Sequence, residues 1–447
     1  MKKVLVSITG AIPPVGGVPI GKTLSFILNT FWPDSEPDIW SLIKDQVEGL
    51  IDEKILDYEL QERNNEIGAI KRTMEMYVDA QIKEKGSLMS TMIHACNELC
   101  IKLTQSKNSV QFIPLVVTHS TLHLLILKER LLHGKEMYDE DNTPVWRKEL
   151  VNQISKYKDY IKDIYSKWVE WRNSQIIVEL GKSLEHVIAP LVTVFKYVSY
   201  GKVYDQLGTE TIYFNDKNYL GNDKEYFRPS CEVVKKKMFG FRNGEMLQIL
   251  VPTFYLDNFI PGNEDNPSVI PSSMSIASFG PISPELDGGK RKPIFYSPDD
   301  DNTWGGDVTR ISVREYNIIE GFQVFYSTGA GLICGSSFGA TVHKIYLHDR
   351  RVQSMKFCYN RCSQVEVTIG FSNGQSTGRL GNRGGWDDVT CVDTGGIDTY
   401  GLYNIRAADN TYVRGDRYER GDNCGQGLFQ IELEYKAYPV RPSELHK

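Results

Sequence analysis

The sequence is poor in cysteine and has no excess of basic charge. Eight cysteines in 447 residues are too few for a scaffold held mainly by disulfides. The two close pairs, Cys96 with Cys100 and Cys358 with Cys362, are spaced C-x-x-x-C, so neither a zinc ribbon nor thioredoxin chemistry is indicated. Because the net charge is -6, no basic field would attract nucleic acid, and we expect no nucleic-acid partner.

Motifs for glycosylation, export and catalysis are also missing. Asn266 is followed by proline and then serine, a sequence that cannot be N-glycosylated. The N-terminal MKKVLVSITGA faintly resembles a secretory signal, but Pro13 and Pro14 break its apolar run. No H-E-x-x-H occurs, and spacing groups no serine, histidine and aspartate into a triad. We therefore expect no enzyme activity, no cofactor and no bound metal.

One stretch matches a phosphate-binding loop. GGVPIGKT satisfies G-x-x-x-x-G-K-[ST] through Gly16, Gly21, Lys22 and Thr23. Pro19 removes one N–H from a cradle that such loops build out of backbone N–H groups, and no strand ending in a magnesium-binding aspartate follows. A nucleotide-driven enzyme is accordingly the third and least favoured of the functions considered.

The amino-acid composition and the apolar periodicity of the chain change near its middle. From 37 to 199 we expect long helical segments, the first with a stripe of Ile39, Ile43, Val47, Ile51 and Ile55 at every fourth residue. Seven of the nineteen prolines lie between 261 and 298, which marks a linker. Twenty of the thirty-eight glycines follow from 304 to 427, between segments that alternate with period two. The second half is therefore expected to be all-β.

Two blocks of the second half look like repeats of one another. The first contains ISVR from Ile311 and FQVFY from Phe322, and the second contains IYLH from Ile345 and MKFCY from Met355. We predict a pair of antiparallel strands in each block, and VEVTIGFSNG and LFQIELEY extend the series. Half-buried strands in a sheet with one polar face have this alternation.

The most informative segment is an uncharged run of twenty residues, 108–127, between Lys107 and Lys128. About twenty helical residues span a hydrocarbon core of ~30 Å. Several hydroxyls and two histidines within it instead favour the fully buried central helix of a soluble bundle, while the protein is in water. His119 and His123 share one helical face, which suggests either a metal site or, as the favoured alternative, two hydrogen-bonded histidines inside the bundle.

Two stretches resemble the pore-forming domain of insecticidal delta-endotoxins. FIPLVVTHSTLHLLILKERLLHGKEM resembles the family's central helix, with its L-P-L and L-H-L-L-L-L-R-D pattern. The matching residues there are Pro114, Leu122, His123, Leu124, Leu125 and Leu127. FWPDSEPDIWSLIKDQVEGLIDEKI resembles the family's first helices through Trp32, Pro33, Trp40, Gln46, Val47, Glu48, Leu50 and Ile51. The resemblance covers about 30–175, and it makes GGVPIGKT a flexible lead-in to a helix rather than a nucleotide site.

The second half resembles the jacalin-like β-prism lectins. WGGDVTRISVREYNIIEGFQVFYSTG, VTIGFSNGQSTGRLGNRGGW and QGLFQIELEYKA carry this similarity. The resemblance implies three four-stranded sheets and a sugar-binding loop just before the last strand pair. Where that family has an aspartate immediately before the strand, this chain has Gly427. The implied carbohydrate-binding residues are Gly305, Gly306, Asp422, Asn423 and Gln426.

The sequence therefore predicts a multidomain protein with an N-terminal α-helical bundle around a hydrophobic helix and a C-terminal all-β prism. The expected limits are 1–262 for the bundle, with 181–229 unplaced, 263–300 for the linker, 301–438 for the prism and 439–447 for a tail. The residues expected to insert into a membrane are Phe112, Leu115, Val116, Leu122, Leu124, Leu125, Ile126 and Leu127.

The predicted function is that of a pore-forming toxin. The prism would bind a cell-surface glycan or glycoprotein receptor, and a helical hairpin of 109–127 with the preceding helix would enter the target-cell membrane as a homo-oligomer. Such a protein would be secreted, or released as a soluble toxin from crystals. The alternative is a multivalent lectin in which the helical domain serves only to oligomerise.

Overall fold

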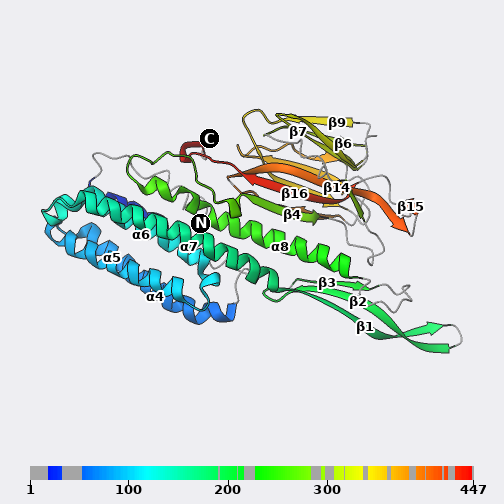
Figure 1. The fold of residues 1–447 in the computed structure, drawn as a ribbon, viewed down its shortest axis with the longest axis horizontal. Coiled ribbons are helices and arrows are strands. Elements are labelled where there is room, and N and C mark those ends of the chain that lie inside the picture. The colour runs from blue at the N-terminus through cyan, green and yellow to red at the C-terminus, as the bar shows by residue number, and fades with distance from the viewer. Residues whose placement is uncertain are drawn as a thin grey trace. The chain divides into compact units, whose positions relative to one another are not determined.

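The computed structural model describes residues 19–32, 53–189, 192–208, 210–215, 227–282, 293–296, 307–316, 318–335, 341–359, 364–381, 389–397, 399–414, 417–420 and 428–444. They form two compact units. The helical unit comprises Met1–Asn173, Glu245–Ser275 and Tyr438–Lys447, and the sheet unit comprises Ser174–Gly244 and Ile276–Ala437. A helical N-terminal region is thus followed by a region rich in β-sheet, as the sequence predicts (Figure 1).

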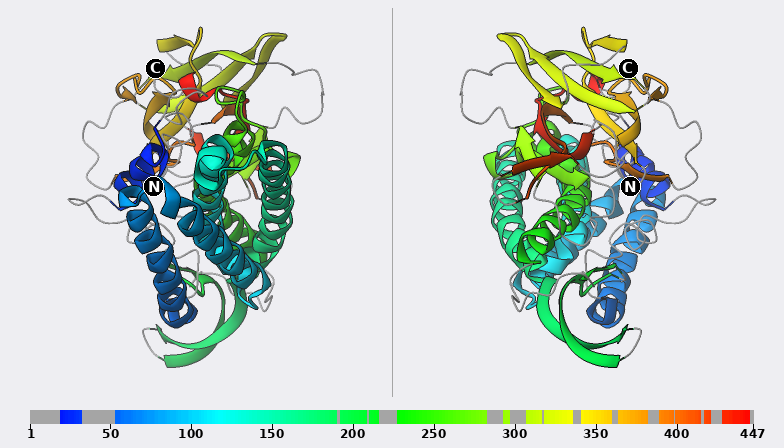
Figure 2. Two further views of the ribbon diagram at one scale, coloured as in Figure 1. Left: turned by 90° about the vertical axis from the view of Figure 1, so that its left-hand side faces the viewer. Right: turned by 90° about the vertical axis from the view of Figure 1, so that its right-hand side faces the viewer.

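Long helices packed lengthwise build the helical unit (Figure 2). They are α2 (Lys22–Phe31), α4 (Glu53–Asp79), α5 (Ile82–Gln105), α6 (Ile113–Tyr138) and α7 (Thr143–Ser174), with the short 3-10 helices η1 (Ser109–Phe112), η2 (Val251–Phe259), η3 (Ser272–Met274) and η4 (Pro442–Glu444). α5 is amphipathic, because its buried residues Met89, Met92, Cys96, Leu99 and Leu103 recur at every third or fourth position. Most of the stripe expected from Ile39 onward lies outside the described residues.

α6 is the buried centre of the helical unit. Pro114 stands in its first turn, where the missing N–H breaks no helical hydrogen bond. The helix ends at Asp139, whose φ of 53° is left-handed. α2, α5 and η2 contact α6, and buried side chains occur all around it. The sequence prediction of a fully buried central helix is therefore confirmed.

The prediction of helix as far as residue 199 is wrong. After Ser174 the chain forms two long antiparallel strands, β1 (Ile176–Ala189) and β2 (Val192–Asp205), followed by β3 (Thr211–Asn215) on the edge of β2. β-Branched and aromatic residues make up most of β2, a composition that favours a strand over a helix. We call β1 and β2 the ribbon; it occupies the first part, up to Asp205, of the stretch 181–229 that the sequence leaves unplaced.

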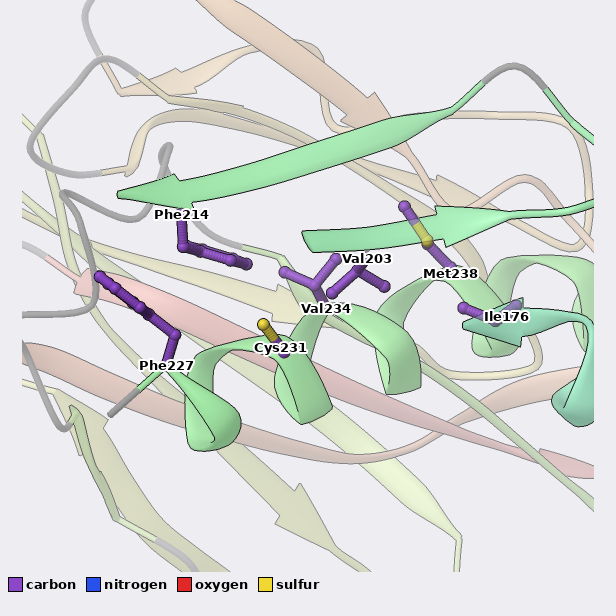
Figure 3. Close-up of a cluster of buried hydrophobic side chains, with 7 residues drawn as sticks. All are labelled: Ile176, Val203, Phe214, Phe227, Cys231, Val234 and Met238. Atoms are coloured by element: carbon purple, nitrogen blue, oxygen red, sulfur yellow. The ribbon is translucent and has the colours of Figure 1, made fainter. Parts of the chain in front are cut away.

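The base of the ribbon packs on α8 (Arg228–Leu250) through one apolar cluster. The cluster comprises Ile176, Val203, Phe214, Phe227, Cys231, Val234 and Met238. Figure 3 shows these side chains between the strands and the helix, with the rings of Phe214 and Phe227 stacked at 6.4 Å between centroids. Further along α8, a Cβ on Gly240 would lie 2.6 Å from the carbonyl oxygen of Ser278. Glycine is therefore what lets α8 approach the next strand, β4 (Ile276–Ile282).

Three antiparallel sheets form the rest of the sheet unit. Their strand orders are β8-β7-β6-β9, β12-β11-β10-β13 and β15-β14-β16-β4, with β5 also paired to β14. The further bounds are β5 (Pro293–Tyr296), β6 (Val308–Glu315), β7 (Ile319–Tyr326), β8 (Gly329–Gly335), β9 (Thr341–Tyr346), β10 (Val352–Tyr359), β11 (Gln364–Phe371), β12 (Leu380–Gly381), β13 (Thr390–Asp393), β14 (Tyr400–Arg414), β15 (Arg417–Arg420) and β16 (Leu428–Ala437). Each sheet contacts both others, through β7 and β14, β10 and β14, and β11 and β7. This is the prism that the sequence predicts.

The predicted pairing within the second block is wrong. β6 and β7 pair as expected, but β9 pairs with β6 and β10 pairs with β11. The chain changes sheets between Tyr346 and Val352, through a turn in which His348 has a left-handed φ of 47°. Alternation of apolar and polar residues indicates that a strand has one buried face. It does not indicate which other strand is its hydrogen-bonded neighbour.

The compact units also group the chain differently from the expected domain limits. Residues 174–244 belong with the prism strands, because α8 packs on both the ribbon and β4. Residues 438–447 belong to the helical unit, where the Ser268 hydroxyl accepts a hydrogen bond from the Val440 N–H at 3.1 Å. A disulfide joins Cys358 of β10 to Cys391, its direct partner on β13.

Candidate functional site

The residues expected to enter a membrane form one continuous buried run on η1 and α6. Phe112, Leu115, Val116, Leu122, Leu124, Leu125, Ile126 and Leu127 are each at most 2% exposed. Ser109–Tyr138, 30 residues, is the one helix among the described residues that is long and apolar enough to cross a membrane. At 1.5 Å per residue its length is about 45 Å, more than the ~30 Å that a hydrocarbon core requires. Length and composition alone are equally typical of a soluble core helix.

The hydroxyl groups inside this run bond to the helix itself. Thr118 donates to the carbonyl oxygen of Pro114 at 3.0 Å, and Ser120 and Thr121 donate to that of Val117 at 2.8 and 3.0 Å. All three side chains are almost completely buried. Because donor and acceptor belong to the same helix, these bonds persist if α6 moves away from its neighbours.

The two histidines of α6 bond to different neighbouring helices. His119 Nε2 lies 3.0 Å from the backbone oxygen of Cys96 on α5. His123 Nδ1 lies 2.8 Å from the hydroxyl of Tyr157 on α7. They are thus the hydrogen-bonded bundle histidines that the sequence favours. Among the described residues, no group of three potential ligands gathers to hold a metal.

Three consecutive charged residues end the uncharged run, and each is held by a different part of the helical unit. Lys128, fully buried, donates to Glu264 in the segment after η2, at 3.2 Å. Glu129, also fully buried, accepts from the Tyr77 hydroxyl of α4 at 3.2 Å. Arg130 pairs with Glu149 of α7 at 2.5 Å. We call these three contacts the tethers of α6.

Glu129 also forms a hydrogen bond with the glycine-lysine motif near the N-terminus. The Gly21 N–H, at the start of α2, donates to Glu129 Oε1 at 2.7 Å. A carboxylate of the protein itself therefore occupies the position in which a phosphate would meet this N–H group. Gly16 lies outside the described residues.

Tyr77 is the second donor to that carboxylate. Burial, with Glu129 beside it, raises the pKa of the Tyr77 hydroxyl above its ordinary value. Tyr77 therefore keeps its proton and remains a donor. The ammonium group of Lys85 lies 4.6 Å from the centre of the Tyr77 ring and donates to the backbone oxygen of Val78 at 3.1 Å. Charged partners therefore gather at one end of α6, whereas the polar partners along the uncharged run are neutral.

The expected sugar-binding residues lie outside the part of the chain that the structure describes; they are Gly305, Gly306, Asp422, Asn423 and Gln426. The tethers, in contrast, are functional candidates that sequence reasoning missed. Lys128, Glu129 and Arg130 are conspicuous after twenty uncharged residues, but the partner of Lys128 is 136 positions away and no local pattern identifies it.

Comparisons with known proteins agree with the helical unit. Residues 5–198 match the family model of the delta endotoxin N-terminal domain. Pesticidal crystal protein Cry8Ca from Bacillus thuringiensis subsp. japonensis is 25% identical over 175 residues, which are 35% of this chain and 14% of that protein. Pesticidal crystal protein Cry19Ba from Bacillus thuringiensis subsp. higo is 23% identical over 183 residues, which are 37% of this chain and 26% of that protein. The matches thus span a minor part of these relatives.

Solved structures are similar over almost the whole chain. PirB has a TM-score of 0.55 at 14% sequence identity, covering 100% of this chain and 96% of that one. The insecticidal crystal protein Cry7Ca1 of Bacillus thuringiensis has a TM-score of 0.59 at 13% identity, covering 99% and 76%. At such identities the similarity concerns the fold, in which a helical region precedes a region rich in β-sheet.

Proposed function

Since residues 5–198 match the family model of the delta endotoxin N-terminal domain, we propose that the chain is a pore-forming toxin of that class. In this proposal α5 and α6 leave the bundle together as a hairpin and enter the membrane of a target cell. The observation that carries the proposal is α6 itself. Its uncharged run is buried inside the helical unit while the protein is in water. Its hydroxyl groups nevertheless need no partner outside the helix.

The hairpin is the unit that can move at the least cost. The apolar side chains of α6 exchange contacts with neighbouring helices for contacts with hydrocarbon. The contact between His119 and the backbone of Cys96 lies within the hairpin, so it is kept. Moving α6 alone would leave the His119 N–H without that acceptor, at a cost of about 1–3 kcal/mol if the ring stays buried.

The hydrogen bond between His123 and Tyr157 is lost when the hairpin leaves, because α7 stays in the bundle. The tethers of α6 must be broken as well, and they place charged groups at the end of the run rather than inside it. They hold the soluble form closed without putting a charge at the bilayer centre, which would cost roughly 2.5–3.5 kcal/mol on insertion scales.

Several hairpins from a homo-oligomer would enclose the channel. The outer face of α5 carries exposed polar residues suited to a water-filled lumen, among them His94 and Glu98, which lie 3.3 Å apart, and Lys102. The apolar residues of α6 would then face lipid or the neighbouring hairpin.

The sheet unit is proposed to bind a cell-surface glycan or glycoprotein, which concentrates the helical unit at the membrane. Its three-sheet prism and the motifs around Gly305, Gly306, Asp422, Asn423 and Gln426 support this part of the proposal. The protein would be secreted or released from crystals as a soluble toxin, and the target-cell membrane is its site of action.

Release of a dye trapped in lipid vesicles tests the function. The protein is added with and without mild protease treatment, to vesicles with and without target-type glycolipids, and agglutination of the vesicles is recorded in parallel. Leakage that rises with protein concentration supports the pore. Agglutination by folded protein without any leakage would instead favour the multivalent lectin.

A variant pair assigns leakage to α6. Leu124→Asp places a charge in the middle of the run and should abolish leakage, whereas Val145→Asp makes the same change at a 61% exposed position of α7 and should not. Because Leu124 is buried, thermal unfolding of both variants is measured first, and leakage is expressed per folded protein.

A further inference from the structure

The ribbon is longer than its packing requires. β1 pairs with β2 in continuous register from Ile176 with Asp205 to Ala189 with Val192. β3 supports β2 only between Tyr200 and Tyr204. Among the described residues no other strand pairs with β1 or with the remainder of β2, and Figure 1 shows both strands running on beyond the end of β3.

The far end of the ribbon is free of charge. Its last three rungs pair Val187 with Val194, Ile188 with Thr193, and Ala189 with Val192. We call these three rungs the ribbon tip. From 187 to 195 the sequence has no charged residue, and the first charged rung, Glu185 with Lys196, comes two rungs below the tip.

Neither face of the ribbon tip carries a charged residue, and each includes apolar ones. Strand geometry places the rungs of Val187 with Val194 and of Ala189 with Val192 on one face, and the rung of Ile188 with Thr193 on the other. A two-stranded ribbon that rests on a protein surface needs apolar residues on one face only. A bilayer surrounds both faces at once, so this pattern favours lipid over a protein partner.

We propose that the ribbon tip is a membrane anchor that dips into the outer part of a lipid bilayer. Three rungs at ~3.4 Å span roughly 10 Å, close to the depth at which segments lie at the headgroup and acyl boundary. The tip is too short to cross, because a transmembrane strand needs about 9–11 residues. This anchor is separate from the α5–α6 hairpin, and it rests on the proposed function only in taking a membrane as the target.

One tyrosine just below the ribbon tip fits a membrane interface. Tyr197, three residues after Val194 on β2, is 64% exposed. Tyrosine is enriched where the headgroups meet water, because its ring is apolar and its hydroxyl is polar.

Co-sedimentation with vesicles of zwitterionic phospholipid, without any glycolipid, tests the anchor. Val194→Glu puts a charge in the ribbon tip, and a second variant replaces 187–194 by Asn-Gly, a two-residue turn that closes the ribbon at His186 and Phe195. Gln206→Glu is the control, because it adds the same charge at an exposed position beyond the other end of β2.

We expect both tip variants to bind vesicles about tenfold more weakly or worse than the wild type and the control, with unchanged thermal unfolding. Binding equal to that of the wild type in the shortened variant overturns the anchor, whether or not the protein leaks dye. So does a lipid-free dimer, seen by ultracentrifugation, that both tip variants abolish, since a second copy would then cover the tip. Tip-dependent binding without leakage keeps the anchor and rejects the pore.

Discussion

Gly134 of α6 lies against the Trp146 ring of α7. A Cβ on this residue would lie 2.4–2.8 Å from three ring atoms of Trp146, and that ring is only 8% exposed. We predict that Gly134→Ala lowers the free energy of unfolding by about 1–3 kcal/mol, because the buried ring has no room to move. Equilibrium denaturant unfolding measures the change.

Gly68 of α4 provides the matched control. A Cβ there meets nothing within 4 Å, so Gly68→Ala should be neutral or stabilise by about 0.5–1 kcal/mol. Equal effects of the two substitutions would mean that helix propensity, and not contact between α6 and α7, decides the outcome at Gly134.

Glu264 holds the charged end of α6 through Lys128. Glu264→Gln should weaken the closed form by roughly 1–3 kcal/mol, because the fully buried ammonium loses its charged partner. We predict a faster onset of vesicle leakage at the same protein concentration.

Asp257→Asn separates this effect from a general loosening of the bundle. Asp257 pairs with Lys158 at 2.8 Å and so joins η2 to α7 rather than to α6. The leakage rate of Asp257→Asn should equal that of the wild type. If both substitutions accelerate leakage equally, the tether on Lys128 has no special role.

Acid should imitate the substitution of Glu264. Burial alone would raise the pKa of this carboxyl, but its backbone hydrogen bonds and Lys128 together hold it below its ordinary value of 4.5. A lowered folded-state pKa contributes stability that is present above pH 4.5 and is lost as the pH falls through the lowered value. We predict that the leakage rates of wild type and Glu264→Gln converge once the pH falls below the lowered pKa of Glu264. A constant ratio between the two rates at all pH values would contradict the prediction.

At this scale the sequence reveals which residues are unusual, but not what they contact. The uncharged run and the charges that end it can be read directly. Gly21 illustrates the limit, because its motif is that of a phosphate loop whereas its N–H bonds to Glu129, 108 residues away. Only the fold brings these groups together.

At the scale of elements, the hairpin is defined by where its hydrogen bonds go. His119 bonds within it and His123 bonds outside it. We predict that Tyr157→Phe, which removes the outside partner, lowers the free energy of unfolding by about 1 kcal/mol and accelerates leakage about fivefold.

Tyr160→Phe on the same helix is the control, because it removes a hydroxyl from α7 while the bond between His123 and Tyr157 stays intact. Slower leakage by Tyr157→Phe than by this control would show that α7 assists insertion instead of restraining it.

The elements themselves were predictable to very different degrees. α6 follows from its run of apolar residues, because a helix that is apolar all round has to be buried somewhere. The ribbon did not follow, since Ile177, Val187 and Val194 fit a buried helix as well as a strand. The disulfide between Cys358 and Cys391 depends on the register of β10 and β13, which no spacing in the sequence shows.

At the scale of the molecule, the chain combines a helical unit with a sheet unit that begins earlier than the composition suggests. The proline-rich stretch from Pro261 to Pro298 predicts a boundary, but α8 already belongs largely to the sheet unit. The limits of a compact unit follow from packing contacts, such as that of Gly240 on β4, and not from the composition of a linker.

The central claim is that α5 and α6 separate from α4 as one hairpin. Two exposed contacts allow distances to be measured between site-specific spin labels. Positions 90 and 138 join α5 to α6, where the Ser90 and Tyr138 hydroxyls lie 3.1 Å apart. Positions 66 and 102 join α4 to α5, where Lys102 pairs with Glu66.

The measurement compares both distances in water and after addition of vesicles that the protein permeabilises. The account predicts that the distance between 66 and 102 increases while that between 90 and 138 stays short. Leakage with both distances unchanged, or with α5 and α6 moving apart, would contradict it.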